Sequence, residues 1–338
     1  MSHLIMVFLL LLLPASVMAE PVVINAVGDI MLAGSGERTF MARGYDYPFA
    51  ATSGILRQGD FVIGNLESPI ALSGNEFTDK RFRFKVNPKA ATALKNAGFT
   101  NLSLANNHIL DFGEEGLKQT LEILDHNEIT HSGAGSDILS ARKAGTNYVK
   151  GLKISSLSYS LTYPEEFFAG AGRAGTAPGY TSHFTADIEQ AKKTADCVIV
   201  SFHWGGEGLD KPKPYQIAAA HKAVDAGADI VLGHHPHVLQ GVEHYRNGVI
   251  FYSLGNFAFG SLSRSSDRSM IARITFESGI KSVEIIPLNV LNSEVGFQPR
   301  PLSGIRAERV ARTVDNLSKP MGSRIAEVDG RYLVLKRD

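Results

Sequence analysis

Short apolar runs recur along the chain, and Gly, Asn, Ser or His comes at or just after the end of each. Apolar residues follow one another in these runs without alternating with polar ones, which is typical of strands buried on both faces. The pattern therefore predicts strands at residues 22–27, 61–63, 101–104, 197–202, 230–232 and 249–252.

Helical patterns separate these runs. Asn87 and Pro88 supply an N-cap and a first helical residue for a helix that runs to about residue 97, where Gly98 ends it. Further helices are expected at about 113–124, 187–195 and 214–226, the last of them stopping at Gly227. Strands that alternate with helices predict an α/β fold, with a largely parallel or mixed sheet covered by helices.

The remaining segments are less regular. Residues 161–185 are rich in Gly, Ala and Tyr without periodicity, and we expect a long surface loop or lid there. Alternating patterns at 271–276 and 283–286 predict antiparallel strands that close a second sheet, followed by a helix at 303–316 and a last strand at 332–335. We find no repeat or linker, so residues 20–338 are expected to form one domain.

Composition limits the class of protein. A chain of 338 residues with 44% hydrophobic content can bury a large core. Lys plus Arg and Asp plus Glu both number 34, so charge gives no sign of a nucleic-acid partner. Neither a phosphate-binding loop nor a Gly-x-Ser-x-Gly motif occurs, which argues against a nucleotide kinase, an ATPase or a serine hydrolase.

The N-terminus predicts export. Residues 4–13 are ten apolar residues in a row, too few to span a bilayer of ~30 Å at ~1.5 Å per residue. Val17-Met18-Ala19 then offers small residues for signal-peptidase cleavage, so we expect residues 1–19 to be a signal peptide and the protein to be periplasmic or extracellular; an uncleaved anchor is the alternative. The single cysteine, Cys197, lies in an apolar run and is interpreted as a small buried hydrophobe.

Chemistry-bearing residues cluster where the predicted strands end. Carboxylate, amide and imidazole side chains together form a ligand set for divalent transition metals such as Mn, Fe or Zn. The segments concerned are Gly28-Asp29, Gly64-Asn65-Leu66-Glu67, Asn106-Asn107-His108, His203-Trp204-Gly205, Gly233-His234-His235-Pro236-His237 and Ser253-Leu254-Gly255-Asn256-Phe257.

Individual residues can be weighed within these segments. In an extended chain His235 and His237 point to one side and reach one metal or two neighbouring ones, whereas His234 should point the other way. His108 follows two asparagines, so its loop can supply a ligand and a proton donor together. Glu67 follows a buried strand and needs a cation nearby if it is to stay charged.

Taken in order, these segments resemble the signature of the CapA family of bacterial capsule or poly-γ-glutamate synthesis proteins, over roughly residues 22–260. That family is similar to the calcineurin-like metallophosphoesterases, which implies a four-layer α/β/β/α sandwich with a two-metal site. By this resemblance Asp29 and His237 hold one metal, Glu67 bridges the two metals, and His108 donates a proton. The same resemblance assigns the second metal to Asn107, His203 and His235.

Other residues of the segments are candidates for binding substrate or for hydrogen bonding to the ligands: Asn65, Asn106, Glu207, His234 and Asn256. The chain departs from the phosphoesterase pattern at three places: Met31, Glu67 in place of an aspartate, and Ile109, not an acid, after His108. Met31 stands where those enzymes carry a histidine, and because a thioether is a poor ligand for harder dications, the first metal site is expected to be weak or empty.

Two functions remain open from the sequence. The first is an exported metal-dependent hydrolase of a phosphoester or an amide or γ-glutamyl bond, with metal-bound hydroxide as nucleophile and His108 as general acid. The second is a non-catalytic scaffold or export subunit that keeps the fold. The expected partners are a polymer or small-molecule substrate and a capsule synthesis complex at the membrane.

Overall fold

Two large β-sheets organise the structure, a computed structural model that describes residues 20–264 and 266–337. The predicted signal peptide at 1–19 lies outside the described residues. Within those residues no helix has the length and apolar character needed to cross a membrane.

The larger sheet has the strand order β17-β18-β15-β14-β1-β2-β3-β4, with β13 paired to β1 and β16 to β15. Its ten strands are β1 Val22–Met31, β2 Phe61–Leu66, β3 Asn101–Ser103, β4 Thr130–Ser132, β13 Asn256–Phe259, β14 Arg268–Glu277, β15 Gly279–Asn289, β16 Arg300–Pro301, β17 Ser323–Val328 and β18 Arg331–Lys336.

The smaller sheet has the order β11-β12-β10-β9-β7-β6. Its strands are β6 Gly145–Val149, β7 Leu152–Ser160, β9 Cys197–His203, β10 Ile230–His234, β11 Val242–Tyr245 and β12 Gly248–Phe251, and a separate two-stranded sheet joins β5 Ala134–Gly135 to β8 Gly175–Thr176. All six strands predicted from the apolar runs are therefore confirmed.

Parallel pairing gives each sheet one functional edge. Strands β1, β2, β3 and β4 run parallel to one another, as do β7, β9, β10 and β12. The carboxyl ends of the strands in each set thus lie at one edge, and side chains that follow them can meet there.

The predicted second sheet from residue 271 onward is wrong in its placement. Strand β14 pairs antiparallel with β1, with Ile274 opposite Ile24, so β14 and β15 extend the larger sheet. The alternating pattern correctly indicated strands with one covered face. It could not tell which sheet they join, because the same alternation suits either.

The helices lie at the positions that the patterns predicted, with one clear shift. Helix α3 ends at Gly98, whose φ of 108° is left-handed and favours glycine. Helix α6 begins at Thr181, not at 187, and the preceding segment contains buried Phe167 and Ala177, so residues 161–185 are not simply a surface loop. The α-helices are α1 Glu37–Arg43, α2 Ser53–Leu56, α3 Lys89–Ala97, α4 Gly113–His126, α5 Ile138–Ala141, α6 Thr181–Lys192, α7 Pro214–Asp225, α8 Asn292–Val295 and α9 Gly304–Ser318.

Residues next to each other in a strand face different cores, which creates four layers. In β9, Cys197 and Ile199 pack in the core that contains residues of both sheets, while Val198 and Val200 pack with α6 and α7. In the larger sheet Ile24 of β1 faces the shared core, and the other face packs with α3 and α4. This confirms an α/β/β/α sandwich, and it confirms Cys197 as a buried, unpaired thiol.

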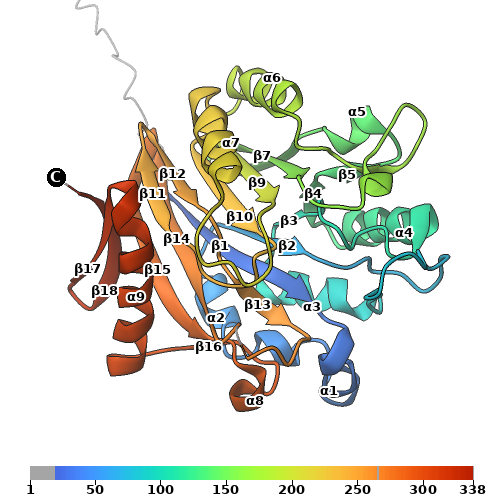
Figure 1. Cartoon of the computed structure of the whole chain (residues 1–338), viewed down its shortest axis with the longest axis horizontal. Helices are drawn as coiled ribbons and strands as arrows, with labels where there is room; N and C mark the ends of the chain where they lie inside the picture. The colour runs from blue at the N-terminus through green and yellow to red at the C-terminus, as the bar shows by residue number, and fades with distance from the viewer. Residues whose placement is uncertain (1–19, 265, 338) are drawn as a thin grey trace, which may run out of the picture.

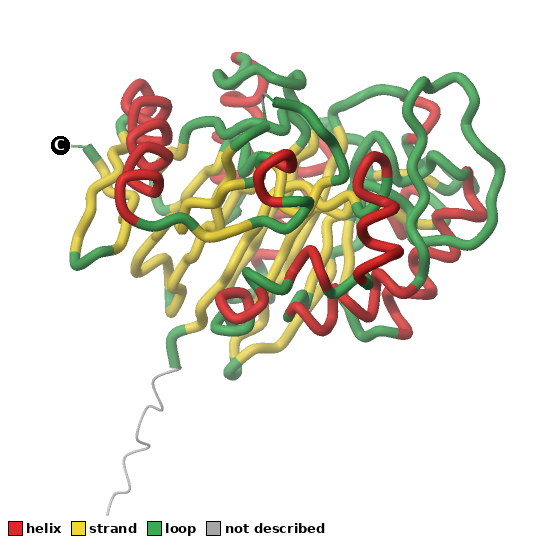
Figure 2. Tube along the Cα trace, turned by 90° about the horizontal axis from the view of Figure 1, so that it is seen from below, coloured by secondary structure: helices red, strands yellow, loops and turns green. Residues whose placement is uncertain are grey.

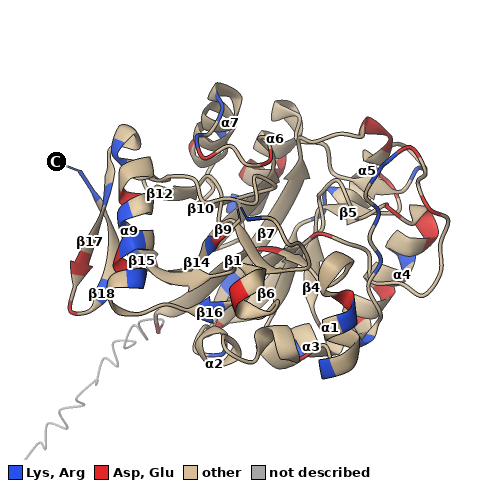
Figure 3. Ribbon diagram, turned by 60° about the horizontal axis from the view of Figure 1, so that its bottom comes forward, with Lys and Arg blue, Asp and Glu red and all other residues tan. Residues whose placement is uncertain are grey.

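Figures 1 and 2 show the strands at the centre of the molecule and α9 at one end, beside β17 and β18 and near the C-terminus. Basic and acidic residues are intermixed along the ribbon in Figure 3, in keeping with the equal totals of the two kinds in the sequence.

Candidate metal centre

The predicted segments converge where the carboxyl ends of the parallel strands of the two sheets lie close together. Asp29 lies near the end of β1, and Glu67 directly follows β2. From the smaller sheet, His203 ends β9 and His234 ends β10, with His203 and His234 in register beside each other. The loop after β3 carries Asn106, Asn107 and His108, and β13 begins with Asn256.

The first set of ligand atoms comes from Asp29, Glu67 and His237, which lie within 4.8 Å of one another. The Nδ1 atom of His237 is 3.1 Å from Oδ2 of Asp29, and its Nε2 is 3.7 Å from Oε1 of Glu67. Two carboxylates and one imidazole can hold a divalent ion between them.

The second set consists of Glu67, His203 and His235, again within 4.8 Å of one another. The Nε2 atom of His203 lies 3.6 Å from Oε1 of Glu67 and 2.8 Å from Oδ1 of Asn107. Glu67 thus belongs to both sets, in the place where the resemblance puts a bridging carboxylate.

Electrostatics at the centre favour a bound cation. Burial and the charge of Asp29 raise the pKa of Glu67 well above its usual value. Burial alone would also raise the pKa of Asp29, but the imidazoles of His234 and His237 outweigh it and hold that pKa well below its usual value. Without a cation, this buried pair of carboxylates is unfavourable when both are charged.

The histidines divide into two kinds. Burial and the positive charge of His237 lower the pKa of His235 to about 3, and burial together with His235 lowers the pKa of His203. Burial disfavours charge on His237 as well, but Glu67 and Asp29 outweigh it and raise its pKa to about 9. His203 and His235 are therefore neutral, which is the form that binds metal.

Orphaned polar atoms test whether a metal fits. Oε1 of Glu67 and Nδ1 of His235 are buried without a hydrogen-bond partner among the described residues. Buried polar atoms of this kind are costly unless they are satisfied, and a divalent ion between Glu67 and the imidazoles of His203 and His237 would satisfy Oε1 of Glu67. The residues present therefore fit a divalent metal centre.

Three asparagines fix the ligands in place. Asn65 Nδ2 donates to Oδ1 of Asp29 at 2.9 Å and approaches Oε2 of Glu67 at 3.4 Å, and its own Oδ1 accepts from Asn106 at 3.0 Å. Asn256 Oδ1 lies 2.9 Å from Nδ1 of His237. Partners of this kind orient metal ligands, so these residues support the centre through hydrogen bonds.

His108 belongs to a separate polar group beside the ligands. Its Nδ1 atom lies 2.6 Å from Oδ2 of Asp111, and Oδ1 of Asp111 accepts from Lys80 Nζ at 2.5 Å. Lys80 also donates to the carbonyl of Asn107. Burial lowers the pKa of His108, although Asp111 opposes this.

Sequence reasoning missed Lys80, which lies in a polar loop with no motif of its own. Asp111 could be seen in the sequence to lie close to His108, three residues further on, but it was not assigned a role. Only the folded structure brings the loop that carries Lys80 to the loop after β3.

Two expectations about the histidine segment are wrong. His234 does not point away, because its Nδ1 lies 3.2 Å from Oδ1 of Asp29. Nor is the segment extended: φ is 91° at His235 and 57° at His237. The left-handed backbone, not strand alternation, brings the two imidazoles to the centre, and such strained residues are common at functional sites.

Position 28 requires glycine because the backbone there lies against the backbone of Gly255. The Asp29 amide donates to the carbonyl of Gly255 at 3.0 Å, and a Cβ on Gly28 would lie 1.8 Å from that same oxygen. The Gly28-Asp29 pair is therefore needed for β1 to approach the segment before β13.

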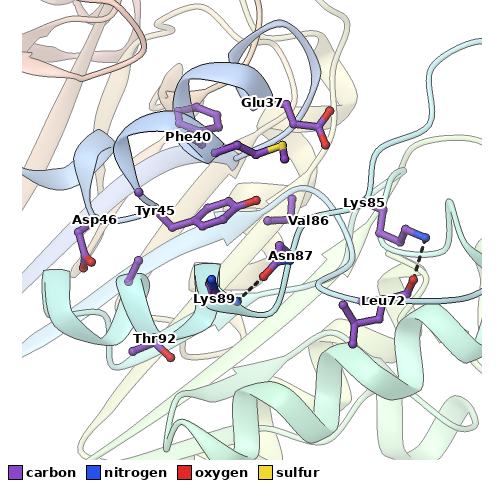
Figure 4. A pocket seen from close by; sticks show the side chains of 14 residues that line it. Glu37, Phe40, Tyr45, Asp46, Leu72, Lys85, Val86, Asn87, Lys89 and Thr92 are labelled. Atoms are coloured by element: carbon purple, nitrogen blue, oxygen red, sulfur yellow. Dashed lines mark hydrogen bonds between the residues drawn. The ribbon is translucent and has the colours of Figure 1, made fainter.

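A cavity of about 600 Å³ opens beside the ligands and is lined by Met31, His108, Glu207, His237 and Asn256, among others. A cavity of about 680 Å³ lies elsewhere, lined by α1, α3 and nearby loops, with Tyr45 and Lys85 on its wall (Figure 4). We assign the chemistry to the former, because it borders the carboxylates and imidazoles.

The comparisons with known proteins agree with this geometry. A family model described as "Bacterial capsule synthesis protein PGA_cap" matches residues 23–261. The chain is 35% identical over 306 residues to the capsule biosynthesis protein CapA of Bacillus anthracis, covering 87% of this chain and 72% of that protein. It is 36% identical over 267 residues to the PGA biosynthesis protein CapA of Bacillus subtilis, covering 78% and 70%.

A relative of lower identity is a probable polyglutamine synthesis accessory protein of Mycobacterium tuberculosis, at 29% over 287 residues, covering 79% of this chain and 74% of that protein. Among solved structures, the NAD nucleotidase NadN of Haemophilus influenzae matches with a TM-score of 0.51 and 15% identity, covering 88% of this chain and 63% of that one.

The 5'-nucleotidase precursor of Thermus thermophilus matches with a TM-score of 0.51 and 12% identity, covering 80% of this chain and 54% of that one. The chain thus spans less than two thirds of either nucleotidase. At these identities the likeness concerns the fold, and it agrees with the expected α/β sandwich.

Proposed function

This chain belongs to the bacterial capsule synthesis protein family PGA_cap, and we propose that it serves capsule synthesis as a metal-dependent hydrolase. The substrate class proposed is a polymer of the poly-glutamate type or a small precursor of it, because the named relatives are capsule, PGA and polyglutamine synthesis proteins. The bond cleaved is an amide or γ-glutamyl bond, or a phosphoester.

One observation carries this proposal: two sets of ligand atoms share the buried carboxylate of Glu67. Divalent ions held by such sets supply Lewis acidity and lower the pKa of bound water. The first set would use Asp29, Glu67 and His237, and the second Glu67, His203 and His235 with Asn107. Manganese, iron and zinc all suit imidazole and carboxylate ligands.

The protein's own residues supply the remaining steps. His108 lines the cavity next to the ligands, where it can protonate a leaving group. Because Nδ1 of His108 is engaged with Asp111, Nε2 is the ring nitrogen from which the protonated imidazole would transfer its proton. Lys80 holds Asp111 from its other oxygen and so keeps the imidazole in one orientation.

A scaffold or export subunit is the second candidate, and Met31 is the observation that favours it. Met31 lines the same cavity as His237, where a thioether adds little to the binding of a hard dication. A first position that holds its ion weakly would leave the fold intact and the hydrolase inactive, with the protein acting as a component of a capsule synthesis complex.

Export by the N-terminal 19 residues is part of the proposal, since a capsule polymer is assembled at the cell surface. It rests on the apolar run at residues 4–13 and the Val17-Met18-Ala19 site. Periplasmic or extracellular placement would put the centre where the polymer is.

The deciding experiment combines metal analysis with activity. Purified protein is assayed for Mn, Fe and Zn and for hydrolysis of a generic phosphodiester and of γ-glutamyl oligomers. Metal with turnover of either substrate supports the hydrolase. Equal rescue of a capsule-deficient strain by wild type and by His108→Ala and His235→Ala variants would instead establish the scaffold.

A further inference from the structure

A third set of ligand atoms lies at the mouth of the centre. Glu207, His235 and His237 each offer one ligand atom, and these atoms are within 4.8 Å of one another. Glu207 is exposed, in contrast to the fully buried Asp29 and Glu67, and it lines the cavity beside His237. The Glu207 side of this set therefore faces solvent.

The loop that carries Glu207 is fastened to the histidine segment. The amide of Gly208 donates to the carbonyl of Pro236 at 2.9 Å, between the two histidines. The amide of Trp204 donates to the carbonyl of His234 at 3.1 Å, and Gln240 Nε2 donates to the carbonyl of Leu209 at 2.7 Å. These hydrogen bonds hold the residues on both sides of Glu207 against the segment that carries His235 and His237.

The donor set is chemically suited to a dication. Two imidazoles and one carboxylate form a common ligand set for divalent transition metals with open coordination positions. Nδ1 of His235 is buried without a hydrogen-bond partner among the described residues, so one member of the set has an unsatisfied ring nitrogen.

We propose that Glu207 is a metal ligand, which with His235 and His237 binds a divalent cation at the solvent-facing mouth of the centre. We call this site the outer position. His235 and His237 each belong to one of the two inner sets as well, so each histidine binds an ion either at the outer position or at an inner one. The outer position is consequently a loading position, filled when the inner sets lack their ions. The outer position rests on the proposed metal-dependent function, but it involves a residue, Glu207, that the inner sets do not include.

The test separates the outer position from the inner ones. Glu67→Gln removes the carboxylate that both inner sets share and leaves Glu207, His235 and His237 untouched. The full chain, stripped of metal, is titrated with Mn²⁺ by calorimetry as wild type, as Glu67→Gln, and as Glu67→Gln combined with Glu207→Gln. Asp210→Asn, on the same loop and outside all three sets, is the matched control in the Glu67→Gln background.

We expect Glu67→Gln to keep one Mn²⁺ per chain, Glu207→Gln to weaken that ion about tenfold or more, and Asp210→Asn to change it little. No residual ion in Glu67→Gln, or equal affinity in the two double variants, overturns the inference. If Glu67→Gln does not fold, Asp29→Asn combined with His203→Ala provides the background, because each of these residues belongs to a different inner set and neither belongs to the outer one. Wild-type protein without any bound Mn²⁺ would refute the proposed function itself, whereas loss of the outer ion alone leaves it standing.

Discussion

The Oε1 atom of Glu67 lies 3.6 Å from Nε2 of His203, although Glu67 follows a strand of the larger sheet and His203 ends a strand of the smaller one. The two sheets therefore meet at a carboxylate and an imidazole. A divalent ion bound between them would tie the sheets together, so metal binding and stability should be coupled.

The first prediction follows from that coupling. Metal-free protein should gain about 2.7 kcal/mol of stability when the ion is present at a hundred times its dissociation constant. Glu67→Gln should lose the part of this gain that the two inner sets supply, because the variant lacks their shared carboxylate, and keep only what an ion at Glu207, His235 and His237 contributes. Thermal unfolding with and without Mn²⁺ measures both effects.

Without metal, Glu67→Gln should not be less stable than wild type. Burial and Asp29 raise the pKa of Glu67, so its charge is unfavourable in the metal-free fold, and Glu67→Gln should be as stable as wild type or more so. His131→Ala, which removes a histidine paired with Asp125 away from the centre, is the control and should leave the metal response unchanged. A Glu67→Gln protein that responds to Mn²⁺ like wild type would contradict the shared-ligand arrangement.

The second prediction separates proton donation from metal binding. His108→Ala should keep near wild-type metal content and lower turnover by roughly 10²–10⁴-fold, the range for losing a general acid. His235→Ala should lose metal and turnover together, since His235 belongs to a ligand set. Elemental analysis and initial rates on one preparation of each variant distinguish the two.

A companion variant tests how His108 is oriented. Asp111→Asn keeps a side chain of the same shape but removes the charge next to Nδ1 of His108, and it should reduce kcat with little effect on KM. If His108→Ala also lost its metal, the imidazole would be a ligand, and the assignment as proton donor would fail.

The third prediction concerns Gly28. Gly28→Ala would place a Cβ 1.8 Å from the carbonyl oxygen of Gly255, so β1 or its neighbour must move, at a cost of about 1–3 kcal/mol or more. Asp29 would shift with it and metal affinity should fall. Gly54→Ala has open space around the new Cβ and should be neutral or slightly stabilising. Urea unfolding of both variants gives the comparison, and equal midpoints would mean that the close approach is unimportant.

The fourth prediction is processing of the N-terminus. If residues 1–19 are a signal peptide, the mature protein begins at Glu20. Intact-mass measurement of protein from the native host checks this. Protein that retains residues 1–19 in a membrane fraction would indicate an anchor instead.

Local features of the sequence determined much of the fold. The six motif-bearing strands were predicted because consecutive apolar residues need burial on both faces, and the end of α3 was predicted because Gly98 adopts a left-handed backbone at low cost. The ligand types were also readable, since Asp29, Glu67 and the histidines stand directly at or after strand ends.

Tertiary structure alone decided what those elements touch. A hydrophobic pattern reports that a face is buried but not against which partner, so it could not show that β14 pairs with β1. Similarly, His234 points toward Asp29 and Lys80 reaches Asp111 through contacts between segments far apart in the chain. The centre exists because the two sheets pack so that the carboxyl ends of their parallel strands lie together. That packing depends on the whole chain, and no local segment encodes it.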